Sequence, residues 1–156
     1  MANMKTMAEL WIERAWDALE DDDDVAAAQH ALHALRMNPH ATDGLLALSQ
    51  TVDVRPVRSA LLREAVRTSK DQLQSRLDDA EDMEAMETLE GHRHVWALRA
   101  LGHFLADSPD PGDQERARSF TDEAEQLDPK DASRSRTHFE SGDVVVVQGN
   151  FRNPSA

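Results

Sequence analysis

Histidine is the residue of this sequence best suited to chemistry near neutral pH, because its side chain changes charge there. Six of the seven histidines fall into two loose groups: His30, His33 and His40, then His92, His94 and His103. A zinc site needs three or four converging ligands, and neither group includes a carboxylate or cysteine at a known ligand spacing. We therefore interpret the histidines as surface residues and predict no metal and no cofactor. A histidine-based metal-dependent hydrolase is the enzymatic alternative.

Other catalytic patterns are absent from the sequence. It contains no nucleophile elbow, P-loop or dinucleotide fingerprint. It has no cysteine, which excludes disulfides and thiolate chemistry. The acidic run Asp21–Asp24 lacks the alternating ligands and the glycine of a calcium loop, and is better explained as negative charge at the start of a helix. We predict that the chain is not an enzyme and has no catalytic residues.

Most of the chain has apolar residues at spacings of three and four, which is the pattern of amphipathic helices. It predicts an all-α fold of about seven helices, over residues 5–20, 25–37, a third from 42, a fourth from 56, then 70–90, 92–106 and 113–127. Pro39 and Pro129 follow two of these helices and end them, because the residue before a proline avoids the helical region. The segment from Ser108 to Gly112 is a predicted turn, and Asp113 is expected to cap the last helix.

The end of the chain has a different composition. We divide the sequence into a helical domain, 5–131, and a polar tail, 132–156, in which Val144–Val147 has the composition of a strand. A single short strand has no sheet to join in a helical chain, so we expect an irregular tail. Two alternatives stay open: the segment docks on the helices, or it pairs with the same segment of a second chain and forms a homodimer.

Acidic residues outnumber basic ones by 30 to 17, which gives a formal net charge of −13. Such a field repels a phosphate backbone, so we expect no nucleic-acid partner, whereas basic or amphipathic protein partners are favoured. No apolar run is long enough to cross a bilayer. The first residues also lack the apolar core of a signal peptide. We expect a cytoplasmic protein that does not bind membranes.

Two helical pairs share a pattern of small residues. Small side chains let two helices approach closely, and a proline ends the second helix. We call each helical pair that ends at such a proline a repeat unit. If Pro39 closes the first repeat unit, the residues that fit the pattern of large and small side chains are Trp11, Ala15, Ala27, Ala31 and Ala34. If Pro129 closes the last unit, they are Leu98, Leu101, Gly102, Leu105, Ala117 and Ala124. A degenerate unit begins between them, near Thr42.

These units resemble the tetratricopeptide repeat (TPR) family over about residues 8–131. Met37–Ala41, Leu45–Leu48 and Leu127–Asp131 are further similar to the TPR proteins related to the suppression-of-tumorigenicity family. The resemblance implies an α-α superhelix of roughly three helical hairpins that acts as a scaffold or adaptor for protein–protein interaction. The length and charge are also similar to those of small acidic TPR-type secretion chaperones, which is the nearest alternative function.

The same resemblance implies where a partner would bind. In TPR stacks, the first helix of each unit lines a concave groove. Carried onto this sequence, the groove positions are Ile12, Trp16, Leu19, Leu46, Gln50, Trp96, Arg99 and His103. Tryptophan and arginine often dominate binding energies at interfaces, which favours this assignment. The alternative is that the tryptophans fill the core, since helical spacing predicts that equally well.

Overall fold

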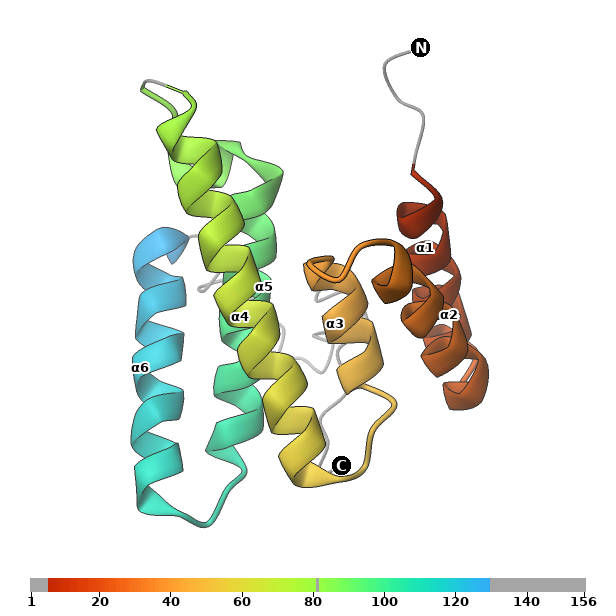
Figure 1. The fold of residues 1–156 in the computed structure, drawn as a ribbon. Coiled ribbons are helices and arrows are strands. Elements are labelled where there is room, and N and C mark those ends of the chain that lie inside the picture. The colour runs from red at the N-terminus through yellow and green to blue at the C-terminus, as the bar shows by residue number, and fades with distance from the viewer. Residues whose placement is uncertain (1–5, 81, 130–156) are drawn as a thin grey trace. The chain divides into compact units, whose positions relative to one another are not determined.

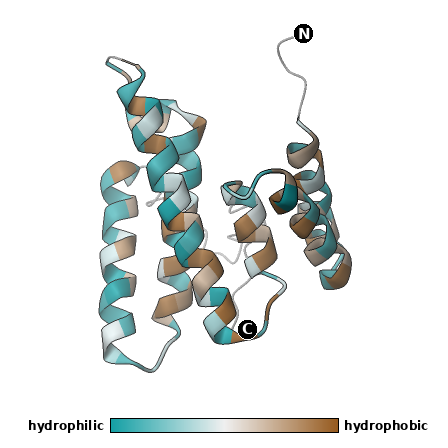
Figure 2. Cartoon of the chain, in the orientation of Figure 1, coloured by the Kyte–Doolittle hydropathy of each residue, from teal (hydrophilic) through white to brown (hydrophobic). Residues whose placement is uncertain are grey.

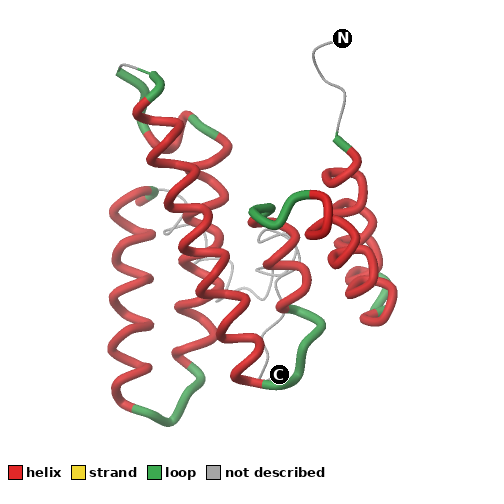
Figure 3. Tube along the Cα trace, in the orientation of Figure 1, coloured by secondary structure: helices red, strands yellow, loops and turns green. Residues whose placement is uncertain are grey.

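The computed structural model describes residues 6–80 and 82–129, and every regular element in these ranges is helical (Figure 1, Figure 3). In chain order the elements are α1 (Met7–Glu20), α2 (Asp24–Met37), α3 (Thr42–Ser49), α4 (Arg55–Asp78), the 3-10 helix η1 (Ala85–Glu87), α5 (Leu89–Ala106) and α6 (Pro111–Leu127). The all-α prediction is confirmed for the described residues. The predicted tail, 132–156 with its valine segment, lies outside them.

The number of helices differs from the prediction because two expected helices are one. The described residues form six α-helices and a 3-10 helix, and α4 continues through the expected break near Thr68 and Ser69. Neither residue interrupts a helix as proline does. Both side chains are buried, and Ser69 Oγ lies within hydrogen-bond distance (3.0 Å) of the Val66 carbonyl oxygen one turn earlier. The helix expected to reach residue 90 ends at Asp78, and Asp82 adopts a positive φ of 61° before η1.

The described residues form two compact units, which we call unit 1 (up to Ala65) and unit 2 (from Val66 onward). The boundary falls inside α4. Each unit is built around a pair of packed helices, α1 with α2 in unit 1 and α5 with α6 in unit 2. Each unit therefore has its own core and can be considered separately.

Unit 1 is built on an alanine-lined hairpin. Ala15 of α1 and Ala27 and Ala31 of α2 are completely buried between the two helices, which pack side by side (Figure 1). Side chains this small let the helix backbones approach closely. The hairpin begins with a capping box, in which the Thr6 hydroxyl accepts from the Glu9 amide and the Glu9 carboxylate accepts from the Thr6 amide. The third helix, α3, packs against α2 and α1.

Unit 2 has a core of larger side chains. Val95 and Leu98 of α5 pack on Ala124 of α6, and partly buried side chains around them include Val66 of α4 and Met86 of η1. Figure 2 shows that α6 is mostly hydrophilic along its length. This agrees with burial of only Ala117 and Ala124 among the residues of that helix. The side of α6 that faces α5 carries these two alanines, and the partly buried Phe120 and Leu127 pack on the same core.

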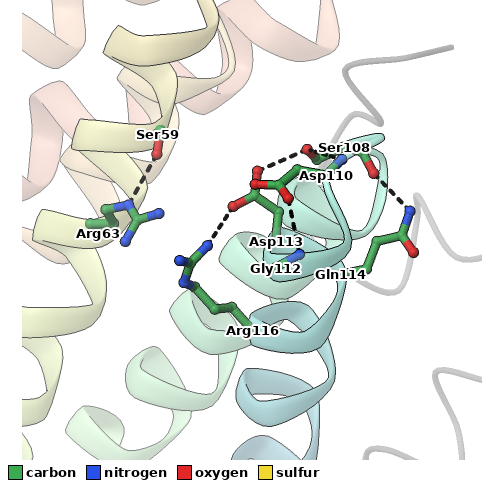
Figure 4. Close-up of polar contacts among 8 residues, drawn as sticks. All are labelled: Ser59, Arg63, Ser108, Asp110, Gly112, Asp113, Gln114 and Arg116. Atoms are coloured by element: carbon green, nitrogen blue, oxygen red, sulfur yellow. Dashed lines mark hydrogen bonds and ion pairs between the residues drawn. The ribbon is translucent and has the colours of Figure 1, made fainter.

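A hydrogen-bonded turn joins α5 to α6 (Figure 4). The buried Ser108 hydroxyl donates to Asp113 Oδ2 (2.8 Å) and accepts from the Asp110 amide (3.2 Å). Asp110 Oδ1 in turn accepts from the Gly112 amide (3.0 Å), so Asp110 is the N-cap of α6 and Pro111 is its first residue. The predicted cap, Asp113, lies inside the helix and pairs with Arg116 (2.7 Å). The turn is where the sequence predicted it, but the cap is three residues earlier.

Replacing Ser108 with alanine is expected to destabilise unit 2 by about 1–2 kcal/mol, because the Asp110 amide and the Asp113 carboxylate each lose a hydrogen-bond partner in a partly buried turn. Urea denaturation followed by circular dichroism measures the change. Ser119→Ala, an exposed serine of α6, is the matched control and is expected to be close to neutral. Equal unfolding midpoints for the Ser108 variant and the unmodified chain would show that the turn does not stabilise the hairpin.

Candidate interaction surface

The α1–α2 hairpin has two long faces, and α3 covers one of them. Leu19 and Trp16 of α1 belong to the same apolar cluster as Ala47 and Leu48 of α3. On the α2 side, Leu35 Cδ2 lies 3.3 Å from the position a Cβ would take on Gly44, which marks a close approach of α3. The face that carries the predicted groove residues of α1 is therefore occupied by the chain's own third helix.

The eight predicted groove residues are placed as follows. Ile12, Trp16 and Gln50 are partly buried in unit 1, and Trp96, Arg99 and His103 are partly buried in unit 2. Leu19 and Leu46 are 2% and 0% exposed. The prediction that these two leucines line an open groove is corrected by the structure: both fill the core of unit 1, because α3 packs over the hairpin there. The structure brings Trp16 and Leu19 into one cluster.

On the opposite face of the hairpin, the indole of Trp11 is the centre of a polar aromatic cluster. Its ring stacks with His33 (centroids 4.7 Å apart, planes at 21°) and with His30 (5.3 Å, 29°) from α2. The guanidinium of Arg14, one turn further along α1, lies 4.8 Å from the ring centroid. A cation over an indole ring is attracted by its quadrupole. The two histidine stacks therefore place the Trp11 ring against α2, and Arg14 contacts the same ring from α1.

Apolar side chains continue this face toward the open end of the hairpin. Met7 is 57% exposed, Leu10 is 37% exposed and Met37 is 52% exposed. On α1, Met7 lies one turn before Trp11 and Leu10 is one turn after Met7, next to Trp11 in the sequence; Met37 lies one turn after His33 on α2. Because the stack pairs Trp11 with His33 across the hairpin, these methionines lie at the same end of it. We call the surface of Met7, Leu10, Trp11, His33 and Met37 the open hairpin face.

The other end of the hairpin is acidic. Glu20 and the four aspartates from Asp21 to Asp24 are all exposed. Asp23 caps α2 by accepting from the Ala26 amide (3.1 Å), and Asp22 turns the chain with a φ of 58°. At a rise of 1.5 Å per residue, this turn is about 15 Å along α1 from Trp11. The hairpin therefore presents an apolar end and an acidic end.

The interpretation of the histidines as surface residues is wrong for His94, which is 3% exposed inside unit 2. Its Nδ1 lies 2.8 Å from Ser69 Oγ of α4, and its Nε2 lies 3.4 Å from Glu123 Oε2 of α6. Burial is the main cause that lowers the pKa of His94 below its ordinary value, with the nearby Lys70 charge acting in the same direction, whereas Glu123 raises it.

The order serine, histidine and carboxylate is that of a hydrolase triad. Ser69 is only 1% exposed, however, so its hydroxyl is closed to a substrate in this conformation. Within residues 6–80 and 82–129, no three histidine, aspartate or glutamate side chains are arranged to hold a metal ion.

Helical spacing contained a signal for the open hairpin face that the groove prediction did not use. Met7, Leu10 and Trp11 recur at three and four residues on α1, and His33 and Met37 recur at four on α2. The alignment with the repeat pattern instead assigned partner binding to the face of Ile12 and Trp16. Which face α3 would cover depends on tertiary packing, which spacing within one helix does not contain.

Comparison of the chain with known protein families, with curated proteins and with solved structures found no match. None of the helices in the described part of the chain is long and apolar enough to span a membrane.

Proposed function

We propose that this chain is a non-enzymatic protein-interaction module that binds an amphipathic segment of another protein on the open hairpin face. The observation that carries the proposal is the exposure of Met7, Leu10 and Met37 around the Trp11 stack. Exposed apolar side chains that are contiguous, rather than scattered, mark interaction sites. Methionine is also suited to such a surface, because its flexible and polarisable side chain adapts to different partners.

The alanine-lined hairpin supports a TPR-like scaffold as the framework of this module. Ala15, Ala27 and Ala31 are buried where the repeat pattern expects small residues. In the last proposed repeat, formed by α5 and α6, Ala117 and Ala124 are buried in the same way. We propose that both hairpins are degenerate TPR units, and that the working face of the first is the one that α3 leaves uncovered.

The distribution of charge defines the partner more closely. A segment lying along α1 would meet apolar side chains at the Met7 end and five exposed acidic residues at the turn, about 15 Å from Trp11. The complementary ligand is an amphipathic helix with an apolar patch and a cluster of lysine or arginine about three turns away. The net charge of −13 would steer such a basic segment toward the chain.

Replacing Leu10 with aspartate is expected to weaken partner binding at least about thirtyfold, which corresponds to the 2 kcal/mol that defines a hot spot. Leu10 is partly exposed, so the fold should remain, and circular dichroism checks this. Affinity is measured by titration calorimetry with a partner captured in the native host by a photo-crosslinker placed at Met37. Leu89→Asp, an exposed leucine of unit 2 that lies outside the face, is the matched control.

The outcomes separate the possible occupants of the face. Loss of binding in the Leu10 variant, with retention in the Leu89 variant, supports the proposal. Equal binding in both variants would show that partners use another surface. If the only species crosslinked at Met37 is a second copy of the chain, the face is a homodimer interface and the heterologous partner is rejected. A partner without a basic cluster would reject the proposed charge complementarity.

A further inference from the structure

The hydrogen bonds around His94 involve one hydroxyl group that has two possible acceptors. Ser69 Oγ lies 2.8 Å from His94 Nδ1 and 3.0 Å from the Val66 carbonyl oxygen. A serine hydroxyl carries a single proton, so it can donate to only one of these atoms at a time. The hydroxyl donates to Nδ1 when Nδ1 is unprotonated, and to the Val66 carbonyl when Nδ1 carries a proton.

The second ring nitrogen determines this choice in the neutral state. His94 Nε2 faces Glu123 Oε2, 3.4 Å away, and an ionised carboxylate only accepts hydrogen bonds. A neutral imidazole therefore places its proton on Nε2, toward Glu123, and leaves Nδ1 as an acceptor. Ser69 then donates to Nδ1. In the protonated imidazole both nitrogens are donors, so Nδ1 donates to Ser69 Oγ and the hydroxyl proton turns to the Val66 carbonyl.

We propose that Ser69, His94 and Glu123 form a proton switch in unit 2, in which the Ser69 hydroxyl turns between His94 Nδ1 and the Val66 carbonyl as the imidazole loses or gains a proton. The switch connects three helices, since Ser69 belongs to α4, His94 to α5 and Glu123 to α6. The Ser69 hydroxyl and both ring nitrogens of His94 have a partner in both charge states. The proposal concerns a different unit from the open hairpin face and does not depend on the proposed function.

The charged groups around His94 determine the direction of the pH effect. Lys70 of α4 opposes its protonation and Glu123 of α6 favours it. On α5 itself, Glu90 lies one turn away and approaches Arg76 of α4 (3.7 Å). The neighbouring Arg93 is partly buried on the same helix, and the glutamates of η1 and its N-cap are exposed. Glu123 is therefore the anion that compensates the charge when the buried ring is protonated.

Acidification is expected to weaken unit 2. In the unfolded chain the pKa of His94 takes its ordinary value of about 6.5, and burial lowers it in the folded chain. Between these two values the unfolded chain binds a proton that the folded chain does not, so the contribution of His94 is fully present above pH 6.5 and is lost as the pH falls through that window. Each unit by which the pKa is lowered changes the ratio of folded to unfolded protein about tenfold.

Nitrogen-15 NMR of the full-length chain tests the switch without any substitution. At pH 7.5 the ring of His94 is expected to carry its proton on Nε2, with Nδ1 unprotonated. As His94 titrates, the carbon-13 shift of the Val66 carbonyl is expected to move with the same midpoint, because the Ser69 hydroxyl turns to it. Two results would overturn the proposal: a neutral ring that is protonated on Nδ1, or a carbon-13 shift of the Val66 carbonyl that stays constant while His94 titrates.

Two variants test the switch through the pH dependence of stability, which a purely structural role of Glu123 would not change. Glu123→Gln removes the anion and is expected to lower the pKa of His94 further. Its folded-to-unfolded ratio should therefore fall more between pH 7.5 and pH 5 than that of the unmodified chain, by about tenfold for each further unit. Glu115→Gln, an exposed glutamate of α6, is the charge-matched control and should follow the unmodified chain. A loss of stability in the Glu123 variant that is the same at both pH values would mean a structural role only.

Discussion

Replacing Gly91 with alanine is expected to destabilise unit 2 by about 1–3 kcal/mol, the typical range for forcing an extra carbon into a packed site. A Cβ on Gly91 would overlap the carbonyl oxygen and carbon of Ala85 in η1. That carbonyl accepts from both the amide (3.1 Å) and the hydroxyl (2.7 Å) of Thr88, the N-cap of α5. Moving it would disturb η1 and the start of α5 together. Urea denaturation measures the loss, and hydrogen exchange should localise it to residues 82–106.

Gly112 is the matched control for this substitution, because it also lies in the first turn of a helix. Its added Cβ would meet nothing closer than Asp110 Oδ1 at 3.5 Å, an ordinary contact. Gly112→Ala is therefore expected to stabilise the chain by up to about 1 kcal/mol, since alanine has the higher helix propensity and reduces the freedom of the unfolded chain. If the two variants changed stability equally, the close contact between η1 and α5 would not be a constraint on the fold.

The helices were predictable from the sequence where neighbouring residues determine where a helix begins and ends. The apolar spacing predicted α1 and α2 to within about two residues at each end, because alanine and leucine recur there and Pro39 ends the pair. The same reasoning located α5 and α6, although their caps at Thr88 and Asp110 lie earlier than expected. The sequence wrongly suggested two helices over α4, one from residue 56 and a strongly charged one from about residue 70, whereas the helix continues through Thr68 and Ser69, whose side chains are buried.

The candidate surface was less predictable than the helices. The sequence indicates which residues share one face of α1, but both faces of the hairpin carry apolar side chains, so composition does not show which face is left open. Packing of α3 decides this. Similarly, His94 reads as an ordinary polar position on α5, and its burial depends on Ser69 and Glu123, which are 25 residues before it and 29 after it in the sequence. Such long-range partners leave no periodic signal within one helix.

A substitution at Leu46 distinguishes between two arrangements: the groove predicted from the sequence and the packing seen in the structure. The repeat pattern placed it in a partner-binding groove, whereas the structure buries it completely in α3. Leu46→Ala is therefore expected to destabilise unit 1 by about 2–5 kcal/mol, because the lost side chain leaves a cavity that the surrounding helices fill only partly. A leucine that lined an open groove would lose far less stability on truncation, since water could enter its place. Thermal and urea denaturation of the full-length chain measure the difference.

Leu32→Ala is the matched comparison, because Leu32 is 44% exposed on α2 in the same unit. Its truncation is expected to change stability by no more than about 0.5 kcal/mol, since alanine also has a slightly higher helix propensity. If Leu46→Ala were as mild as Leu32→Ala, α3 would not be fixed on the hairpin, and the face of Trp16 and Leu19 would again be open to a partner. A large loss at Leu46 alone confines partner binding in unit 1 to surfaces that α3 leaves free, which is the condition that the open hairpin face requires.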